Sequence, residues 1–124
     1  MDDKRLTAKI DFSNYNVVRN MILNRSDAMT SAFYQQSYRP LSHEYNNYDI
    51  EIVEYITDIY KELDRLIIKS KLNDKNKLIV DMLGVGYTIE IIAEKFGVPK
   101  NTIFKMLRRI SLKINQIAIK ENKV

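Results

Sequence analysis

The amino-acid sequence predicts an all-α fold. Only three glycines and two prolines occur among 124 residues, so few positions interrupt a helix. Apolar residues recur at spacings of three and four through most of the chain, as they do on the buried face of a helix. The 45% hydrophobic content is enough for a modest core, and one small helical domain is the expectation for this length.

The first third of the chain predicts two short helices and a connector. Asn14 and Ser26 are suitable N-caps for helices that carry Val17, Val18, Met21 and Ile22, and then Met29 and Phe33. The tyrosine-rich stretch from Tyr34 to Tyr48 contains Pro40, which disfavours helical backbone at the residue before it. We therefore expect residues 1–47 to form an N-terminal helical segment with a polar connector, and residues 48–124 to form the main body.

A long central amphipathic helix is predicted from about Asp49 to Lys71. Its apolar residues follow one another at steps of four and three: Ile52, Ile56, Ile59, Leu63 and Leu66, with Val53, Tyr60 and Ile67 widening the stripe. A stripe this wide must be buried against other helices of the same chain or of a second subunit. The acidic residues off the stripe predict a solvated face: Glu51, Glu54, Asp58, Glu62 and Asp64.

A short helix follows, capped by Asn73 or Asp74 and ending at Gly84. Its predicted apolar side consists of Leu78, Ile79, Met82 and Leu83.

Composition excludes several kinds of site. The chain has no cysteine, which excludes disulfides, thiolate zinc sites and a cysteine nucleophile. The single histidine, His43, lies in the connector without an obvious partner, so we expect no enzyme, metal or cofactor. No apolar run approaches the roughly 20 residues of a membrane span, and the acidic start is unlike a signal peptide. The expectation is a cytoplasmic protein with no membrane contact.

The charge is distributed unevenly along the chain. From Lys95 onward there are eight basic residues and one acidic residue, whereas the preceding part has 12 basic and 15 acidic residues. A basic segment on an acidic body predicts a polyanionic partner bound at one end.

The segment from Thr88 to Ile110 has the spacing of a helix-turn-helix. Ala93 is small enough for two helices to cross closely, and Gly97, four residues later, can adopt the positive φ of a sharp turn. Thr88 is a suitable N-cap for the first helix, and Pro99 suits the start of the second. The inward positions are apolar: Ile89, Ile92, Phe96, Val98, Ile103, Met106 and Ile110.

The outward face of the second helix carries the chemistry expected of a protein that reads double-stranded DNA in the major groove. The predicted base-contacting residues are Lys100, Asn101, Phe104, Lys105 and Arg108. Phe104 has an alternative role, packing against another helix. The residues predicted to contact phosphates are Lys95, Thr102, Arg109 and Lys113.

With these residues in view, the segment from Asn73 to Ile114 resembles the region of bacterial sigma factors that reads the −35 promoter element. Residues Tyr87 to Val98 resemble its scaffold helix, and the base-contacting positions of the family correspond to Lys100, Asn101 and Lys105. Phe104 stands where the family usually has a basic residue. The layout of residues 45 to 115 looks more like phage late-gene transcription regulators of the ArpU and RinA kind than like a complete sigma factor.

The leading hypothesis is a sequence-specific transcription regulator of a phage or prophage, with an activator favoured over a repressor. It would bind DNA through the motif and contact either RNA polymerase or a second copy of itself through the rest of the chain. The DNA-recognition small subunit of a phage packaging terminase and a sigma-like module that binds RNA polymerase are the alternatives. The predicted homodimer interface is formed by Ile52, Ile56, Ile59, Leu63 and Leu66; the alternative is that Val17, Val18, Met21, Ile22 and Phe33 cover this stripe within one chain.

Overall fold

The computed structural model describes residues 10–37 and 47–122, with side chains for residues 10–30 and 53–121. All regular secondary structure in these ranges is helical, which confirms the all-α prediction. The helices are α2 (Tyr15–Ser37), α3 (Asn47–Ser70), α4 (Asp74–Gly84), α5 (Ile89–Phe96) and α6 (Lys100–Asn122). None of the helices in this part of the chain has the length and apolar content required to cross a bilayer.

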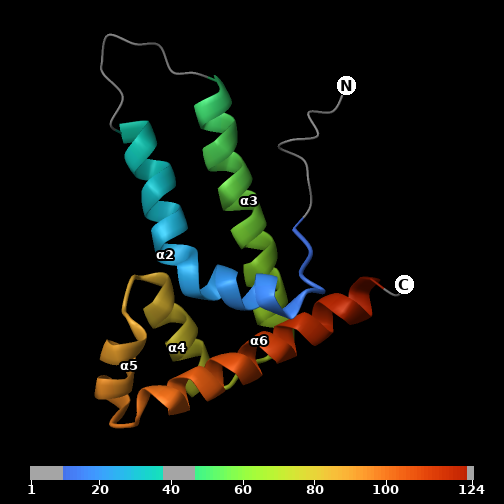
Figure 1. Ribbon diagram of the computed structural model, residues 1–124. Coiled ribbons are helices and arrows are strands. Elements are labelled where there is room, and N and C mark those ends of the chain that lie inside the picture. Colours follow the sequence, from blue (N-terminus) through green and yellow to red (C-terminus); the bar gives the residue numbers. More distant parts are fainter. Residues whose placement is uncertain (1–9, 38–46, 123–124) are drawn as a thin grey trace.

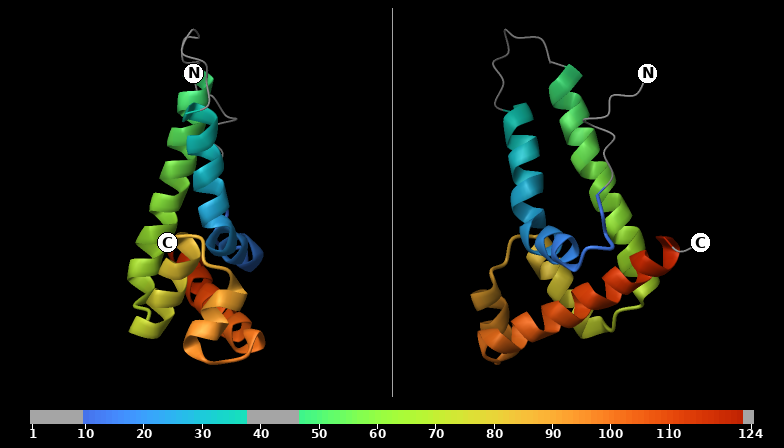
Figure 2. Two further views of the ribbon diagram at one scale, coloured as in Figure 1. Left: turned by 90° about the vertical axis from the view of Figure 1, so that its left-hand side faces the viewer. Right: turned by 45° about the vertical axis from the view of Figure 1, so that its right-hand side comes forward.

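The helices form two groups that share one core. In Figure 1, the later part of α2 stands beside α3, and α6 crosses below both of them. Helix α2 packs against α3, α4 and α6, whereas α5 packs mainly against α6. Both views in Figure 2 place α5 and the beginning of α6 at the end of the molecule opposite the last turns of α2 and the first turns of α3.

Helix α2 corrects the prediction of two separate short helices. Asn14 acts as predicted at the start, since its Oδ1 atom accepts a hydrogen bond from the Asn16 N–H at 2.9 Å. Ser26 does not begin a second helix, because α2 continues through it to Ser37 and bends instead of ending (Figure 1). The helix therefore also includes the first residues of the predicted connector, from Tyr34 to Ser37. Pro40 and His43 lie outside the described residues.

The bend brings Ser26 against the connection between α4 and α5. Gly86 in that connection has φ 104°, and a Cβ atom added to it would lie 3.1 Å from the Ser26 Oγ atom. The backbone conformation of this residue therefore favours glycine, and a Cβ atom here would also require the Ser26 side chain to shift by a few tenths of an ångström.

The core is one continuous cluster to which every helix contributes. Its fully buried members are Val18, Ile22, Leu63, Leu66, Ile79, Ile92, Ile103, Leu107, Ile110 and Ile114. Each fully buried aliphatic side chain of this size stabilises the fold by about 1.5–3 kcal/mol relative to exposure.

The apolar stripe of α3 is partly covered within the same chain. Val18 and Ile22 of α2 belong to the same buried cluster as Leu63 and Leu66, whose exposed fractions are 0% and 1%. These two leucines therefore have no surface left for a second subunit, which corrects their predicted role at an interface. Ile56 and Ile59 are half-buried, and the side chain of Ile52 lies outside the described residues.

A polar clamp joins α2 to α3. The Arg25 guanidinium donates to both carboxylate oxygens of Asp64, at 2.5 and 2.8 Å, and lies 5.1 Å from the centre of the Tyr60 ring. Tyr60 in turn donates to the backbone carbonyl of Met21 at 3.1 Å, and burial raises its pKa above the usual value. Asp64, expected on a solvated face, therefore helps to fix the angle between two helices.

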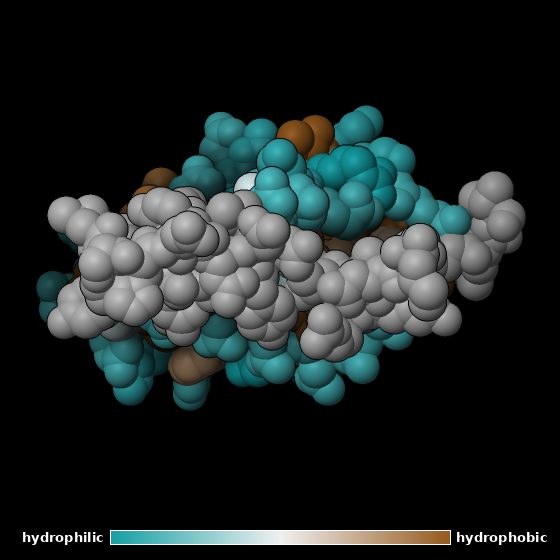
Figure 3. Space-filling model, turned by 90° about the horizontal axis from the view of Figure 1, so that it is seen from above, coloured by the Kyte–Doolittle hydropathy of each residue, from teal (hydrophilic) through white to brown (hydrophobic). Residues whose placement is uncertain are grey.

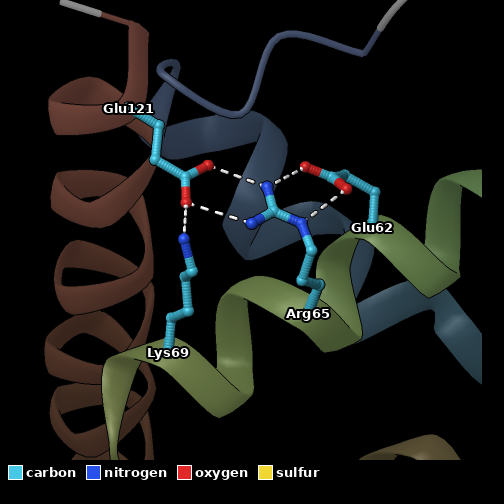
Figure 4. A network of polar contacts seen from close by, with 4 residues as sticks. All are labelled: Glu62, Arg65, Lys69 and Glu121. Carbon is cyan, nitrogen blue, oxygen red and sulfur yellow. Dashed lines mark hydrogen bonds and ion pairs between the residues drawn. The ribbon is translucent and has the colours of Figure 1, made fainter. Parts of the chain in front are cut away.

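A second cluster joins the end of α6 to α3 (Figure 4). Arg65 donates to carboxylate oxygens of both Glu62 and Glu121, and Lys69 donates to Glu121 at 2.6 Å. Hydrogen bonds from Arg65 and then Lys69 lower the pKa of Glu121 to about 2. Glu62, another residue expected only to be solvated, takes part in the same network, which holds the last turns of α6 against α3.

Helix α4 begins as predicted. The Asn73 side chain caps it by accepting a hydrogen bond from the Asn76 N–H at 2.8 Å. Its buried side, however, includes Val80, whereas Leu78 is 48% exposed, contrary to the prediction. The reason is rotational: the buried side is centred between Ile79 and Leu83, and at about 100° per residue Val80 lies nearer to that centre than Leu78 does.

Candidate nucleic-acid interface

The candidate site is built on α5, the connection that follows it, and the first half of α6. Thr88 caps α5 as predicted, because its Oγ1 atom accepts a hydrogen bond from the Ile91 N–H at 3.2 Å. Its backbone carbonyl accepts another from the Ile92 N–H at 3.0 Å. These bonds fix the start of α5 directly after the α4–α5 connection.

Gly97 ends α5 in the left-handed conformation, with φ 68° and ψ 35°. The next residue, Val98, donates its backbone N–H to the Ala93 carbonyl at 3.0 Å, which closes the turn and satisfies one of the last carbonyls of the helix. Pro99 then precedes the first residue of α6 and accepts from the Thr102 N–H at 3.0 Å. The predicted conformation of Gly97 is therefore confirmed.

Apolar contacts hold α6 against α5 and α4. Ala93 is 4% exposed, and Ile92 and Ile103 are completely buried, while Ile89, Phe96, Val98 and Met106 are half-buried against the core. Leu107 is also completely buried, although the sequence reasoning did not include it. Its position, four residues after Ile103 and three before Ile110, is the signal that would have identified it.

All five residues predicted to contact bases are exposed. Asn101, Lys105 and Arg108 lie on the side of α6 that faces away from Ile103 and Ile110, and Phe104, 40% exposed, lies beside them. Lys100 is exposed at the first residue of the helix. The five residues extend over about 12 Å of helix axis, at 1.5 Å per residue, which is similar to the width of about 12 Å of a DNA major groove.

The residues predicted to contact phosphates flank this surface. Lys95, Arg109 and Lys113 are exposed, whereas Thr102 is half-buried. The Lys95 ammonium lies 5.7 Å from the centre of the Tyr87 ring, and Lys113 donates to the Lys71 carbonyl at 3.5 Å. Both cations therefore have contacts with neighbouring residues that limit the directions in which they point.

The charges at the centre of this surface are mostly uncompensated. Lys100 Nζ lies 3.9 Å from Glu90 Oε2, a distant and exposed ion pair. Within residues 53–121, no carboxylate forms an ion pair with Lys105, Arg108 or Arg109. Exposed cations without anionic neighbours produce a positive potential that attracts a polyanion.

Figure 3 shows the molecule from above; among its coloured residues, hydrophilic ones predominate around a few hydrophobic ones. The five residues predicted to contact bases belong to the first half of α6, which starts beside α5 at the lower end of the molecule in Figure 1. The described residues also contain no group of three or more acidic, histidine or cysteine side chains arranged to hold a metal ion.

Comparisons with protein-family models, with curated proteins and with solved structures find no match to this chain.

Proposed function

We propose that this chain is a sequence-specific DNA-binding transcription regulator whose α5 and α6 act as a helix-turn-helix. The observation that carries the proposal is the first half of α6. One of its sides is buried through Ile103, Leu107 and Ile110, and the other presents an amide, an aromatic ring and several cations to solvent. A major-groove reading helix has this division between an anchored side and a hydrogen-bonding side.

The exposed side chains supply both kinds of contact that sequence-specific binding requires. The Asn101 amide matches the N6 and N7 atoms of adenine, and Lys105 or Arg108 matches the O6 and N7 atoms of guanine. Phe104 offers an apolar surface for a thymine methyl group. Arg109 and Lys113, farther around the helix, would add affinity through phosphates in this proposal.

The resemblance to phage late-gene regulators supports a phage or prophage origin and a role as an activator that also contacts RNA polymerase. A homodimer remains part of this proposal, because one short recognition surface buries little DNA and a two-fold axis doubles it. The half-buried residues Ile56 and Ile59 are the members of the predicted interface that retain some surface. Sedimentation of the intact chain distinguishes a dimer from a monomer and from the rings expected of a terminase subunit.

Selection of binding sites from a random duplex library tests the proposal directly. We expect one enriched motif, and we expect Asn101→Ala to weaken binding to it by about 1–3 kcal/mol while relaxing the preference at one base pair. Gln116→Ala is the matched control, since it changes an exposed amide on the second half of the same helix. Failure to enrich any motif, or equal losses for the two variants, would contradict sequence-specific reading by α6.

A further inference from the structure

A hollow of about 370 Å³ lies between the last turns of α3 and the middle of α4, away from the base-reading side of α6. Its lining is mainly apolar: Ile67, Ile68, Leu72 and Val80. Leu72 and Val80 are buried, whereas Ile68 is 76% exposed and is the most exposed large apolar side chain in the described part of the chain. An isoleucine this exposed beside an open hollow is a feature that a binding partner would cover.

Cations dominate the rim of this hollow. Lys71 and Lys77 line it, and Lys113 reaches the same edge, because it donates to the Lys71 carbonyl at 3.5 Å. Asp81 is the acidic residue of the lining, and its charge contributes to the raised pKa of Arg25, so it lies within the field of that guanidinium. The rim is therefore positive on balance.

The backbone at Lys71 is unusual. Lys71 has φ 53° and is the one residue other than glycine with a positive φ in the described ranges. It follows the end of α3 and donates its N–H to the Ile68 carbonyl at 3.2 Å, a position at which helices commonly have glycine. A lysine in this conformation is less stable than a glycine would be, and its side chain places a cation at the rim.

We propose that this hollow binds a segment of a partner protein in which a large aliphatic side chain is followed or preceded by a carboxylate. The aliphatic side chain would pack on Ile68, Leu72 and Val80, and the carboxylate would pair with Lys71 or Lys77. An apolar centre with a charged rim is the anatomy of a protein–protein contact. A nucleic-acid backbone, in contrast, would use the lysines and leave Ile68 exposed.

The hollow and the base-contacting side of α6 occupy different sides of the molecule, although Lys113, the proposed phosphate contact, lies at the edge of both surfaces. Lys113, which borders the hollow, is about 120° around the axis of α6 from Asn101, at about 100° per residue. A partner bound here leaves Asn101, Lys105 and Arg108 free. This inference does not depend on DNA binding by α6.

Panning the intact protein against a random twelve-residue peptide library displayed on phage tests the proposal. We expect enrichment of peptides that combine Leu, Ile or Val with Asp or Glu within a few positions. A synthesised peptide from the enriched set should bind the wild-type protein in solution, and Ile68→Ser should weaken it at least tenfold. Lys71→Gly should weaken it severalfold while raising the melting temperature, because glycine adopts this backbone conformation at lower cost.

Ile91→Ser is the matched control, since Ile91 is a 44% exposed isoleucine on α5 and should leave peptide binding unchanged. The proposal is overturned if the enriched peptides share no consensus of apolar and acidic residues. It is also overturned if the wild type and Ile68→Ser bind the selected peptide equally well. Duplex affinity is measured for the same variants. The proposal is wrong if Lys71→Gly and Lys77→Gln lower duplex affinity while Ile68→Ser changes neither duplex affinity nor peptide affinity. In that case the rim belongs to a nucleic-acid surface. If the wild-type protein binds the peptide but does not bind DNA, the proposed function is refuted and the inference about the hollow is not.

Discussion

Replacement of Gly97 by alanine is a direct test of how the turn between α5 and α6 is stabilised. Gly97 has φ 68°, and a Cβ atom added there would meet no atom within 4 Å. The cost of alanine is therefore conformational and not steric. The left-handed conformation costs an L-residue about 1–2 kcal/mol, and part of this is offset because alanine also restricts the unfolded chain by about 0.4–1 kcal/mol.

We therefore expect Gly97→Ala to lower the free energy of unfolding by about 1 kcal/mol, which corresponds to about 3–6 °C in melting temperature for a domain of this size. Gly97→Asn should cost less, since asparagine tolerates this conformation better. The assay is chemical denaturation followed by circular dichroism at 222 nm, with thermal melting as a second readout.

Alanine substitutions at the two other glycines provide the comparisons for this experiment. Gly86 has φ 104° and its added Cβ would lie only 3.1 Å from Ser26 Oγ, so Gly86→Ala should cost more than Gly97→Ala. Gly84 has no positive φ, and its added Cβ would make an ordinary contact of 3.8 Å with Arg25 Cδ, so Gly84→Ala should be close to neutral. A loss at position 97 that equals or exceeds the loss at position 86 would refute this reasoning, as would no loss at all.

Three further experiments test the candidate interface, the core and the α3–α6 network. Arg109→Ala and Lys113→Ala should each weaken binding to all duplexes and reduce the slope of log K against log salt by about one unit, and an unchanged slope would place them away from phosphates. Ser111→Ala should raise the free energy of unfolding by about 1 kcal/mol, since the Ser111 hydroxyl is fully buried without a hydrogen-bond partner in the described residues; a loss in urea denaturation would show that the hydroxyl is bonded. Glu121 has its pKa lowered from 4.5 to about 2, so its ion pairs contribute fully above pH 4.5 and their contribution is lost as the pH falls towards 2. Glu121→Gln should flatten the dependence of melting temperature on pH across that window, and Glu94→Gln, an exposed glutamate outside the network, should not.

The elements defined by local sequence were predictable. Asn73 and Thr88 cap their helices with their own side chains, and Gly97 ends α5 through its own backbone freedom. Each of these signals depends on residues within four positions of one another, so one sequence contains all the information required.

The features that depend on distant residues were not predictable in the same way. Ser26 has the chemistry of an N-cap, but its surroundings include Gly86, 60 positions later in the chain. Asp64 looks like a solvated residue because its partner, Arg25, is far away in sequence. Glu62 has a local partner in Arg65, but the sequence does not show that Arg65 also binds the distant Glu121. The apolar stripe of α3 could be covered by a second subunit or by α2. The spacing of the apolar residues is the same in the two cases, so the sequence of α3 does not distinguish between them.

The distant contacts of α6 explain why the helix is long, because its second half holds the whole helix against the rest of the fold. Its first half carries the exposed side chains, whereas Ile114 and Ala118 in its second half are buried and Glu121 is tied to α3. Asn115, also buried, donates to the Phe12 carbonyl at 3.0 Å and so fastens the helix to the segment that precedes α2. If α6 reads DNA as proposed, its reading surface must be held to within about 0.5 Å, and a helix anchored along its second half meets this need better than a loop does. The second half of α6 therefore fixes the direction in which Asn101, Lys105 and Arg108 point.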